Sequence, residues 1–456
     1  MQITETNSDG LKRQLRVVIG AGEIGERFKA RLDEIKGSVQ LKGFRKGMVP
    51  ETHLKKLFGR SMMAETLQQM VDESSRKALS ERNERPAMTP QIELAKEGNE
   101  IDKVIDGDAD LAFDMSFEIL PEIKFADFSS LNLTRMTAEV EDKAIDDALA
   151  ALAERNTNYE AEEGRAGENG DRITIDFVGK IGGEPFENGS GEDVPIVLGQ
   201  SRFIPGFEEG LIGAKAGEER QLNVTFPEAY QVETLKGQAA TFDVKVKEVA
   251  KPVRPAIDED FAKGLGAESL ENLRELVKSQ IQREYDQASR QKLKRALLDA
   301  LDTTHDFALP PSLVDAELEG IMQQMKRSLE SSGRTFEDEG KTEEEARAEY
   351  RKIAERRVRL GLLIGEIGEK NKIDVSQEEL RAALIQQARQ FTGQERMVLE
   401  YYEKNPQAVA ELRAPIFEDK VVDFLLELAK PAERKVTREE LLAPEEEELP
   451  NQPAAG

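Results

Sequence analysis

The chain of 456 residues contains no cysteine and only two histidines, His53 and His305. The lack of cysteine excludes disulfides, thiolate metal sites and cysteine nucleophiles. The two histidines lie far apart in the sequence, so we expect neither a histidine-based zinc site nor a catalytic triad. We therefore expect no bound metal ion and no cofactor.

Long apolar runs are also absent. No stretch approaches the roughly 18 apolar residues that a membrane span requires. The first ten residues, MQITETNSDG, carry neither the basic start nor the apolar run of a signal peptide. We therefore expect a soluble cytoplasmic protein with no membrane partner.

Positive charge is scarce in the chain as a whole, because 64 Lys and Arg face 90 Asp and Glu, for a net charge of −26. A uniformly acidic surface would repel nucleic acid. The charge is not uniform, however, because residues 1–112 hold 19 basic and 19 acidic residues. The acidic excess lies entirely beyond them, and any anionic partner is expected to meet the N-terminal part.

Hydrophobic patterning divides the chain into segments of different type. Alternation near residues 11–19 and helical periodicity at 51–84 predict a small α+β unit. Fourteen of the 34 glycines fall in residues 161–250 among short β-type runs, which predicts an antiparallel β domain. The predicted segments are an α+β domain (1–112), a connector with a helix (113–160), a β domain (161–250), a helical domain (251–435) and a disordered acidic tail (436–456).

The helical domain shows start signals as well as periodicity. Thr342 with Glu345 and Ser376 with Glu379 each fit a capping box, in which hydroxyl and carboxylate satisfy free amides of the first turn. Its apolar stripes predict packing within the domain, with a remainder exposed for partners. Long helices are predicted at 269–301, 312–331, 342–370, 376–391 and 406–428.

One motif suggests a nucleotide site. Gly20–Gly25 matches G-x-G-x-x-G between a strand and a helix. The preceding strand alternates apolar and charged residues, which suits a half-exposed antiparallel strand. No acidic residue lies between Glu34 and Glu51, where a ribose-binding carboxylate should fall. We favour a simple glycine-rich turn, and saturable cofactor binding would be needed to support a nicotinamide enzyme.

A second motif concentrates positive charge. Between Lys36 and Arg60 there are seven basic residues and one acid, a local net charge of 7 − 1 = +6. Inside this stretch, the loop Gly43–Pro50 joins a Phe to Arg and Lys between two glycines and a proline. Arg and Lys donate hydrogen bonds to carboxylates or phosphates, and Phe offers an apolar anchor. The loop therefore favours an anionic partner over an ordinary solvated surface.

The pattern Gly43-Phe44-Arg45-x-Gly47-x-x-Pro50 resembles the signature of the bacterial trigger factor family of ribosome-associated chaperones. The resemblance extends over essentially the whole chain. It implies docking on the large ribosomal subunit beside the exit tunnel, against a ribosomal protein and nearby RNA. It also implies binding of nascent and unfolded polypeptides, and weak self-association off the ribosome. The docking residues that it implies are Gly43, Phe44, Arg45, Lys46, Gly47 and Pro50.

The aromatic series of the β domain resembles an FKBP-type peptidyl-prolyl isomerase. Six of the 19 phenylalanines fall in this stretch. Glu187 stands where such domains usually have Asp, and Phe207 where many have Trp. Prolyl isomerisation needs no nucleophile, metal or general base, so the missing cysteines are compatible with catalysis. The resemblance implies a site formed by Phe177, Phe186, Glu187, Ile204, Phe207, Tyr230 and Phe242.

The resemblance implies a multidomain α+β fold. Its parts are an N-terminal α+β ribosome-docking domain, a central antiparallel β+α FKBP-like domain and a C-terminal all-α chaperone domain with arms. The resemblance also implies that the connector, residues 113–160, packs on the C-terminal domain. No G-x-x-x-x-G-K-[ST] motif is present, so we expect a chaperone that works without ATP. The alternative is an FKBP-type isomerase or holdase with no ribosome docking, and the basic loop distinguishes the two.

Overall fold

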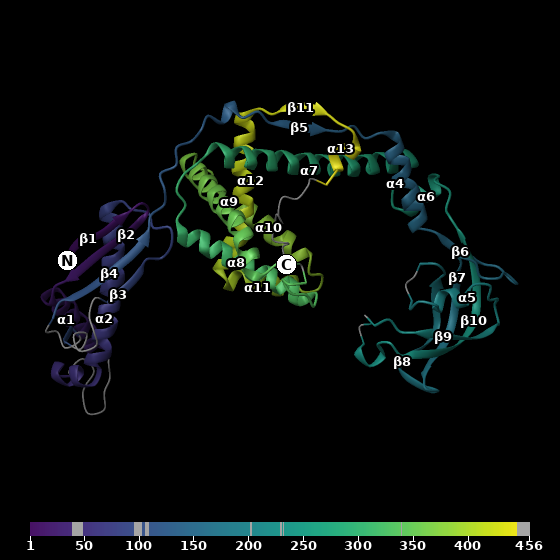
Figure 1. The fold of residues 1–456 in the computed structure, drawn as a ribbon, viewed down its shortest axis with the longest axis horizontal. Coiled ribbons are helices and arrows are strands. Elements are labelled where there is room, and N and C mark those ends of the chain that lie inside the picture. The colour runs from purple at the N-terminus through teal and green to yellow at the C-terminus, as the bar shows by residue number, and fades with distance from the viewer. Residues whose placement is uncertain are drawn as a thin grey trace. The chain divides into compact units, whose positions relative to one another are not determined.

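The computed structural model describes residues 1–38, 49–94, 103–104, 109–200, 203–228, 230, 232–338 and 340–444. Figure 1 labels the helices and strands. The chain divides into two compact units. One combines Met1–Arg135 with Arg290–Arg434, and the other combines Met136–Ser289 with Lys435–Ala443.

The first unit begins with a four-stranded antiparallel sheet. Its core face alternates as the sequence predicts, since Leu15 and Val17 of one strand pair with Met115 and Phe113 of the next, and all four are buried. Two helices, α1 (Ala21–Ser38) and α2 (Glu51–Arg82), cover this face and complete one apolar core. The strands lie in the order β1 (Gln2–Asp9), β2 (Lys12–Ile19), β4 (Leu111–Glu118) and β3 (Gln91–Leu94).

Two features of this sheet differ from the prediction. β1 was not expected, because its polar sequence QITETNSD has no apolar alternation and it is held by backbone pairing with β2. The predicted boundary at residue 112 is also wrong, since it cuts through β4. The glycine-rich turn Gly20–Gly25 does lead from β2 into α1. β2 is antiparallel to both of its neighbours, so the turn is not part of a βαβ nucleotide-binding unit.

Residues 121–133, which we call the strap, pack along the helical part of the same unit. The strap contains the short helix η1 (Phe128–Ser130). Ile123 and Leu133 of the strap are buried in one cluster with Leu297, Leu363 and Val421 of three helices. The helices are α7 (Leu270–Thr304), α8 (Pro311–Ser331), α9 (Glu343–Lys370), α10 (Gln377–Arg389), α11 (Glu395–Lys404) and α12 (Pro406–Ala429), and the first part of α7 belongs to the second unit.

The helical part forms as its sequence signals predict. Both predicted capping boxes are present, because the Thr342 and Ser376 hydroxyls accept the amides of Glu345 and Glu379. α8 pairs with α9 over a second apolar cluster. Only α11 was not predicted, and it has no buried residue.

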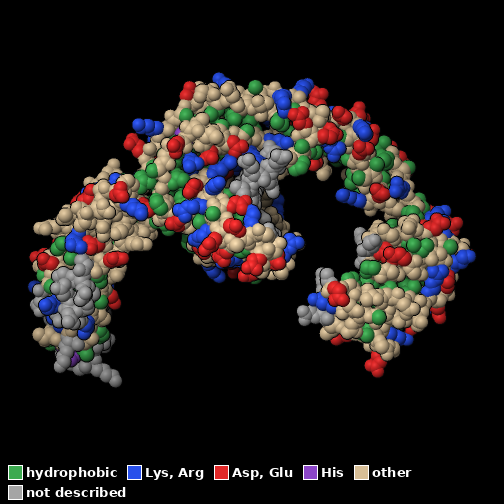
Figure 2. All heavy atoms as spheres, viewed as in Figure 1, with side chains coloured by type: hydrophobic (Ala, Val, Ile, Leu, Met, Phe, Trp, Pro, Cys, Tyr) green, Lys and Arg blue, Asp and Glu red, His purple; other side chains and the backbone are tan. Residues whose placement is uncertain are grey.

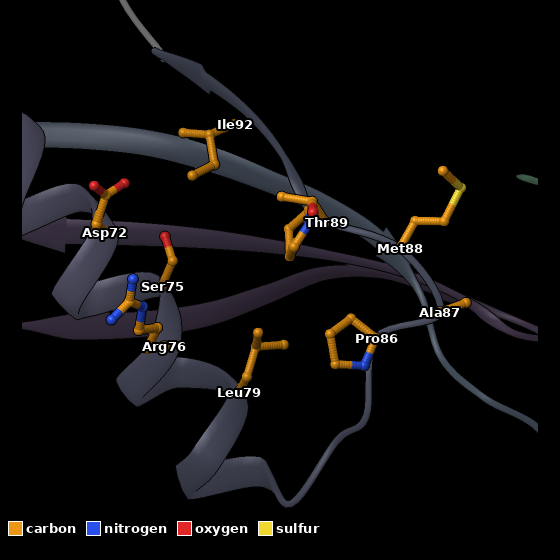
Figure 3. A pocket seen from close by; sticks show the side chains of 10 residues that line it. Asp72, Ser75, Arg76, Leu79, Pro86, Ala87, Met88, Thr89 and Ile92 are labelled. Carbon is orange, nitrogen blue, oxygen red and sulfur yellow. The ribbon is translucent and has the colours of Figure 1, made fainter. Parts of the chain in front are cut away.

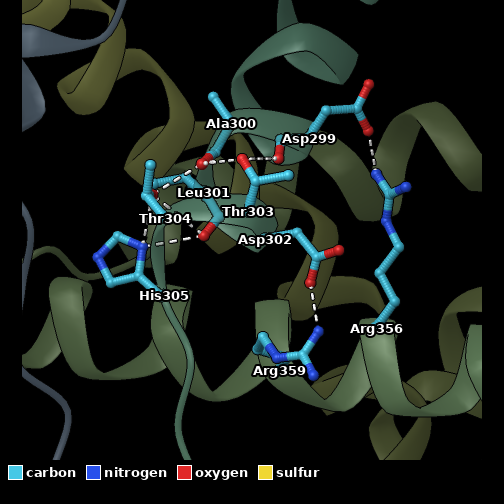
Figure 4. A network of polar contacts seen from close by, with 9 residues as sticks. All are labelled: Asp299, Ala300, Leu301, Asp302, Thr303, Thr304, His305, Arg356 and Arg359. Carbon is cyan, nitrogen blue, oxygen red and sulfur yellow. Dashed lines mark hydrogen bonds and ion pairs between the residues drawn. The ribbon is translucent and has the colours of Figure 1, made fainter.

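Ion pairs tie the exposed faces of these helices together. Figure 2 shows basic and acidic side chains intermingled over this part of the molecule. Asp302 of α7 accepts from Arg359 of α9 at 2.6 Å, and Asp299 pairs with Arg356 one turn away (Figure 4). Each pair lies near the surface, so each contributes little to stability.

The second unit is built around a five-stranded antiparallel sheet. The long strand β10 (Ala239–Val253) pairs with three others, so its aromatic and β-branched residues face a single core. The short helix α5 (Phe207–Leu211) packs on this core through both of its end residues. The other strands are β6 (Asn158–Ala161), β7 (Arg172–Ile181), β8 (Glu184–Val197) and β9 (Glu219–Thr225), and η2 (Glu233–Leu235) lies before β10.

Two helices and a terminal element complete this unit. α4 (Asp142–Arg155) packs with α6 (Glu259–Gly264) and the start of α7. The expectation of a disordered tail from residue 436 is wrong at its start, because Arg438–Leu442 form α13 and Leu441 is fully buried. Residues 445–456 lie outside the described part. β11 (Ala432–Lys435) pairs with β5 (Thr134–Thr137) just before α13.

The expected fold class, α+β with a β-rich central domain and a helical C-terminal domain, is confirmed. Among the described residues, no helix combines the length and the apolar character that crossing a membrane would need.

Candidate functional site

The second unit gathers most of the predicted isomerase residues around one ring, Phe242 of β10. Phe207 of α5 meets it edge-on at 5.2 Å between ring centroids, and Phe177 of β7 lies 6.0 Å away. Phe186 of β8 approaches from another side, also at 6.0 Å. Three strands and a helix thus supply four rings in contact, a geometry that aromatic pairs favour.

The remaining predicted residues lie at the edge of this cluster. Tyr230 reaches it through Phe226, with 4.8 Å between their ring centroids. Ile204 packs against the same core and is half-buried. Glu187 is exposed next to Phe186. The half-buried members leave one side of the aromatic cluster accessible, while Phe207 and Phe242 are only 1% and 5% exposed.

Two aromatic residues of the cluster are absent from the predicted set. Phe226 contacts both Phe186, at 6.0 Å, and Tyr230. Phe203 stacks on Phe207, with 5.3 Å between centroids and 17° between planes. Both are among the six phenylalanines of the predicted β domain, so their sequence signal was present. Only the fold shows that they extend the cluster at its two ends.

Glycines on the neighbouring strands make room for the rings. A Cβ at Gly179 of β7 would lie 2.6 Å from Phe186 and 2.7 Å from Phe242. A Cβ at Gly191 of β8 would lie 2.8 Å from Phe177. No side chain larger than hydrogen fits at these positions unless the rings move, so the glycines help to set the ring positions.

Charged side chains flank the aromatic cluster, but they lie on the other face of the strands. Asp243, next to Phe242, accepts from Lys180 at 2.7 Å, and this hydrogen bond lowers the pKa of its carboxyl. The Lys247 ammonium donates to Asp176 at 2.8 Å and, with the Asp193 amide, lowers the pKa of that carboxyl. Strand alternation places these ion pairs on the opposite face from Phe177 and Phe242. The ring side therefore has the apolar character that a proline ring needs.

A backbone donor lies next to the rings. Within the described residues, the Ile204 amide donates no hydrogen bond, while its carbonyl accepts the Phe207 amide at 3.1 Å. Pro205 has no N–H to offer. The Ile204 amide is therefore available as a hydrogen-bond donor beside the rings.

Three family models match the chain in succession. The model of the bacterial trigger factor N-terminal part covers residues 1–152, and that of FKBP-type peptidyl-prolyl cis-trans isomerases covers residues 163–247. The model of the trigger factor C-terminus covers residues 269–427. The chain belongs to the bacterial trigger factor family.

Full-length relatives agree with this assignment. The trigger factor of Xanthobacter autotrophicus is 50% identical over 98% of this chain and 99% of its own length. That of Azorhizobium caulinodans is 51% identical over 98% and 99%. That of Parvibaculum lavamentivorans is 53% identical over 97% of this chain and 86% of its own length.

A solved structure shows the same fold. It is titled "Promiscuous Substrate Recognition in Folding and Assembly Activities of the Trigger Factor Chaperone". The two chains share 21% identity and a TM-score of 0.57, over 94% of this chain and 99% of the other.

Membership of the trigger factor family establishes the general function. The protein is a ribosome-associated chaperone, and its FKBP-type domain makes it a peptidyl-prolyl cis-trans isomerase. It binds ribosomes and nascent chains. The alternative of an isomerase without ribosome docking is therefore set aside.

Most of the predicted docking loop of this trigger factor lies outside the described residues. These positions are Gly43, Phe44, Arg45, Lys46 and Gly47. Pro50 is described and stands directly before α2, with an extended backbone at φ −62° and ψ 140°. Proline suits this place, because its fixed φ and missing N–H are compatible with a helix start. Pro50 thus leads directly into α2, which begins at Glu51.

The N-terminal domain also contains a surface hollow of about 740 Å³. Figure 3 shows it between α2 and the segment that leads into β3. Leu79, Met88 and Ile92 supply apolar surface, while Asp72 and Arg76 lie on the helix side. Met88 and Ile92 are 45% and 37% exposed. The lining offers contact surface and no pair of groups arranged for proton transfer.

Proposed function

We propose that the aromatic cluster of the FKBP-type domain is the proline-binding pocket of the isomerase. The observation that carries this proposal is that Phe177, Phe186 and Phe207, from two strands and a helix, each contact the ring of Phe242. Glu187 stands at the exposed rim. The proposed pocket consists of Phe177, Phe186, Ile204, Phe207, Tyr230 and Phe242.

The pocket would act by favouring the twisted amide. The barrier to rotation about a peptide bond is about 18–20 kcal/mol, because twisting abolishes amide resonance. The planar amide has greater charge separation and gains more from water than the twisted form does. An apolar pocket removes that water, so it stabilises the transition state relative to the bound planar peptide.

Two polar groups would orient the peptide. The Ile204 amide, which donates to no described residue, can hold a carbonyl of the bound chain. Tyr230, half-buried beside Phe226 at the edge of the cluster, would offer its hydroxyl as a second polar group. A hydrogen bond that strengthens as the amide twists adds directly to the rate. No proton transfer is required of either group.

Replacement of one ring tests the pocket. Phe207→Ala removes a ring that contacts three others. We expect kcat/KM on a proline-containing peptide to fall by at least about tenfold. Phe391→Ala, at a phenylalanine of the helical domain that is 43% exposed, is the matched control. Unchanged kcat/KM in a folded Phe207→Ala variant would contradict the pocket assignment.

We also propose that the loop at residues 43–50 docks on the large ribosomal subunit near the tunnel exit, against a ribosomal protein and adjacent RNA. The sequence supports this, because the local charge of +6 stands in a chain of net charge −26. Arg and Lys suit phosphates and carboxylates, and Phe44 adds an apolar contact. The acidic remainder would discourage unspecific binding to RNA.

Ribosome co-sedimentation tests the docking loop. Replacing Phe44, Arg45 and Lys46 together with Ala should abolish co-sedimentation. A matched triple variant at the exposed residues Phe391, Arg396 and Lys404 removes the same side-chain types from the helical domain. It should bind as the wild type does. Binding that survives the loop substitutions would exclude these residues as the docking contact.

The remaining assignments follow family membership. We propose that residues 1–112 with the rest of β4 bind the ribosome, that the connector continues to residue 160, and that residues 161–250 form the isomerase domain. The helical domain, 251–435, would hold clients. We further propose a cytoplasmic location and weak self-association away from the ribosome.

A further inference from the structure

The FKBP-type domain contains a buried carboxylate that the proposed pocket does not use. Glu208 is 5% exposed, whereas its neighbour Glu209 is exposed. A buried carboxylate is unfavourable unless its oxygens accept hydrogen bonds. One oxygen of Glu208 accepts the Gly199 amide at 2.9 Å, and the other accepts the Phe203 amide at 3.2 Å. Both carboxylate oxygens of Glu208 therefore accept hydrogen bonds from backbone amides.

The segment that Glu208 holds leads directly into α5. The Glu209 carboxylate accepts the Gly206 amide at 2.9 Å, and the Phe207 amide donates to the Ile204 carbonyl. The Phe203 ring is stacked on Phe207 at the same place. Backbone groups at both ends of residues 203–206 are thus fixed to the helix, while the Ile204 amide is left without an acceptor among the described residues.

We propose that Glu208 is a positioning residue for the isomerase. Its two oxygens hold the backbone at Gly199 and Phe203, so that the Ile204 amide and the Phe203 ring stay in place for the peptide. Glu208 itself does not touch the substrate. This inference rests on the proposed pocket, because Ile204 and Phe207 belong to it.

The chemistry of the site explains why a carboxylate is required. A carboxylate offers two acceptor oxygens, and each faces an N–H here. Gln has one acceptor and one NH₂ donor, so Glu208→Gln would set a donor against one of the two amides. The variant keeps the size of the side chain and loses one of the two attachments.

Kinetics on the full chain test this. We expect Glu208→Gln to lower kcat by at least about tenfold while KM changes less than about threefold, because the rings that bind proline remain and the donor to the twisting peptide shifts. The control is Glu219→Gln, at an exposed glutamate of β9 that pairs with Lys245 at 3.2 Å. This variant should have the kcat and KM of the wild type.

A folded Glu208→Gln variant with wild-type kcat would overturn the proposal. Activity lost in Phe207→Ala but kept in Glu208→Gln would leave the pocket standing and remove only this role.

Amide hydrogen exchange on the wild-type chain tests the same proposal even if the variant does not fold. The Gly199 and Phe203 amides should exchange at least about a hundredfold more slowly than the Ile204 amide. A saturating proline-containing peptide should then slow exchange at Ile204. Rapid exchange at Gly199 and Phe203 would show that Glu208 does not hold them, and would overturn the assignment.

Discussion

The ring of Phe207 meets the ring of Phe242 edge-on, with 5.2 Å between centroids and 89° between planes. Both side chains are almost fully buried, and they come from a helix and a strand that the sequence separates by 35 positions, 242 − 207. Edge-to-face contacts fix the relative orientation of two rings. The shape of the proposed pocket therefore depends on whatever sets the position of Phe242.

Gly179 is the first such determinant. A Cβ there would lie 2.6 Å from Phe186 and 2.7 Å from Phe242, closer than carbon atoms approach. Gly179→Ala should push both rings out of place and lower kcat/KM by at least about tenfold. The measurement is the isomerase assay on a proline-containing peptide.

Gly361→Ala is the control for this substitution. Nothing lies within 4 Å of a Cβ at Gly361, which is in the exposed part of α9. Alanine is the better helix former there, so this variant should gain about 0.5–1 kcal/mol and keep its isomerase activity. Wild-type kcat/KM in Gly179→Ala would mean that the ring positions do not limit catalysis.

A second pair of glycines tests packing in the helical domain. A Cβ at Gly368 of α9 would overlap the Phe417 ring of α12, whereas a Cβ at Gly365, one turn earlier, would meet nothing within 4 Å. Overpacking of a core costs about 1–3 kcal/mol. We expect Gly368→Ala to destabilise the domain by about this amount in urea unfolding, and Gly365→Ala to stabilise it slightly. Equal effects at both positions would exclude the close approach of α9 and α12.

The sequence predicts those elements whose signals are local. The capping boxes at Thr342 and Ser376 need only residues three apart, and both are present. β1 and β11 were missed because their sequences are polar and both strands are held by backbone pairing with a neighbouring strand. Whether such elements form depends on contacts with distant parts of the chain, and a local sequence pattern carries no information about these contacts.

The candidate site was predictable in its aromatic part only. The aromatic series of the β domain carried the resemblance, and the fold brings Phe177, Phe186 and Phe207 around Phe242. Nothing in Glu208-Glu209 indicates which carboxylate is buried, because both are charged residues on a five-residue helix. Glu208 can be buried because the amides of Gly199 and Phe203 donate hydrogen bonds to its carboxylate, and only the folded chain brings these amides to it.

Acid should weaken the start of α10 through Glu379. Its carboxylate accepts from the Lys420 ammonium at 2.9 Å and from the Ser376 hydroxyl and amide at 2.7 Å, which lowers its pKa from the usual 4.5 to about 2. A lowered pKa in the folded state gives stability that is present above pH 4.5 and is lost as the pH falls towards 2. We expect Glu379→Gln to be less stable than the wild type at pH 7, with the difference shrinking across this window.

Urea unfolding at pH 7, 5, 4 and 3 measures this effect. Glu378→Gln changes an exposed glutamate one residue earlier on the same helix, and should leave the unfolding midpoint unchanged at each pH. A difference between Glu379→Gln and the wild type that stays constant from pH 7 to pH 3 would show that the ionised carboxylate is not its source.

The two histidines provide the last prediction. His305 is 4% exposed, and its Nε2 accepts a hydrogen bond from the amide of Ala126 in the strap at 3.1 Å. Nδ1 therefore carries the proton and donates to the Leu301 carbonyl at 2.9 Å, a contact that Figure 4 shows. His305→Leu leaves the Ala126 amide without an acceptor, at a cost of about 1–3 kcal/mol. We expect faster amide exchange in residues 121–133 and a lower urea midpoint.

The control is His53→Leu, at an exposed position of α2, which should change neither the exchange rate nor the urea midpoint. Because the strap also packs through Ile123 and Leu133, the variant should loosen it locally without unfolding the helices. Wild-type exchange in the strap of His305→Leu would mean that apolar packing alone holds it.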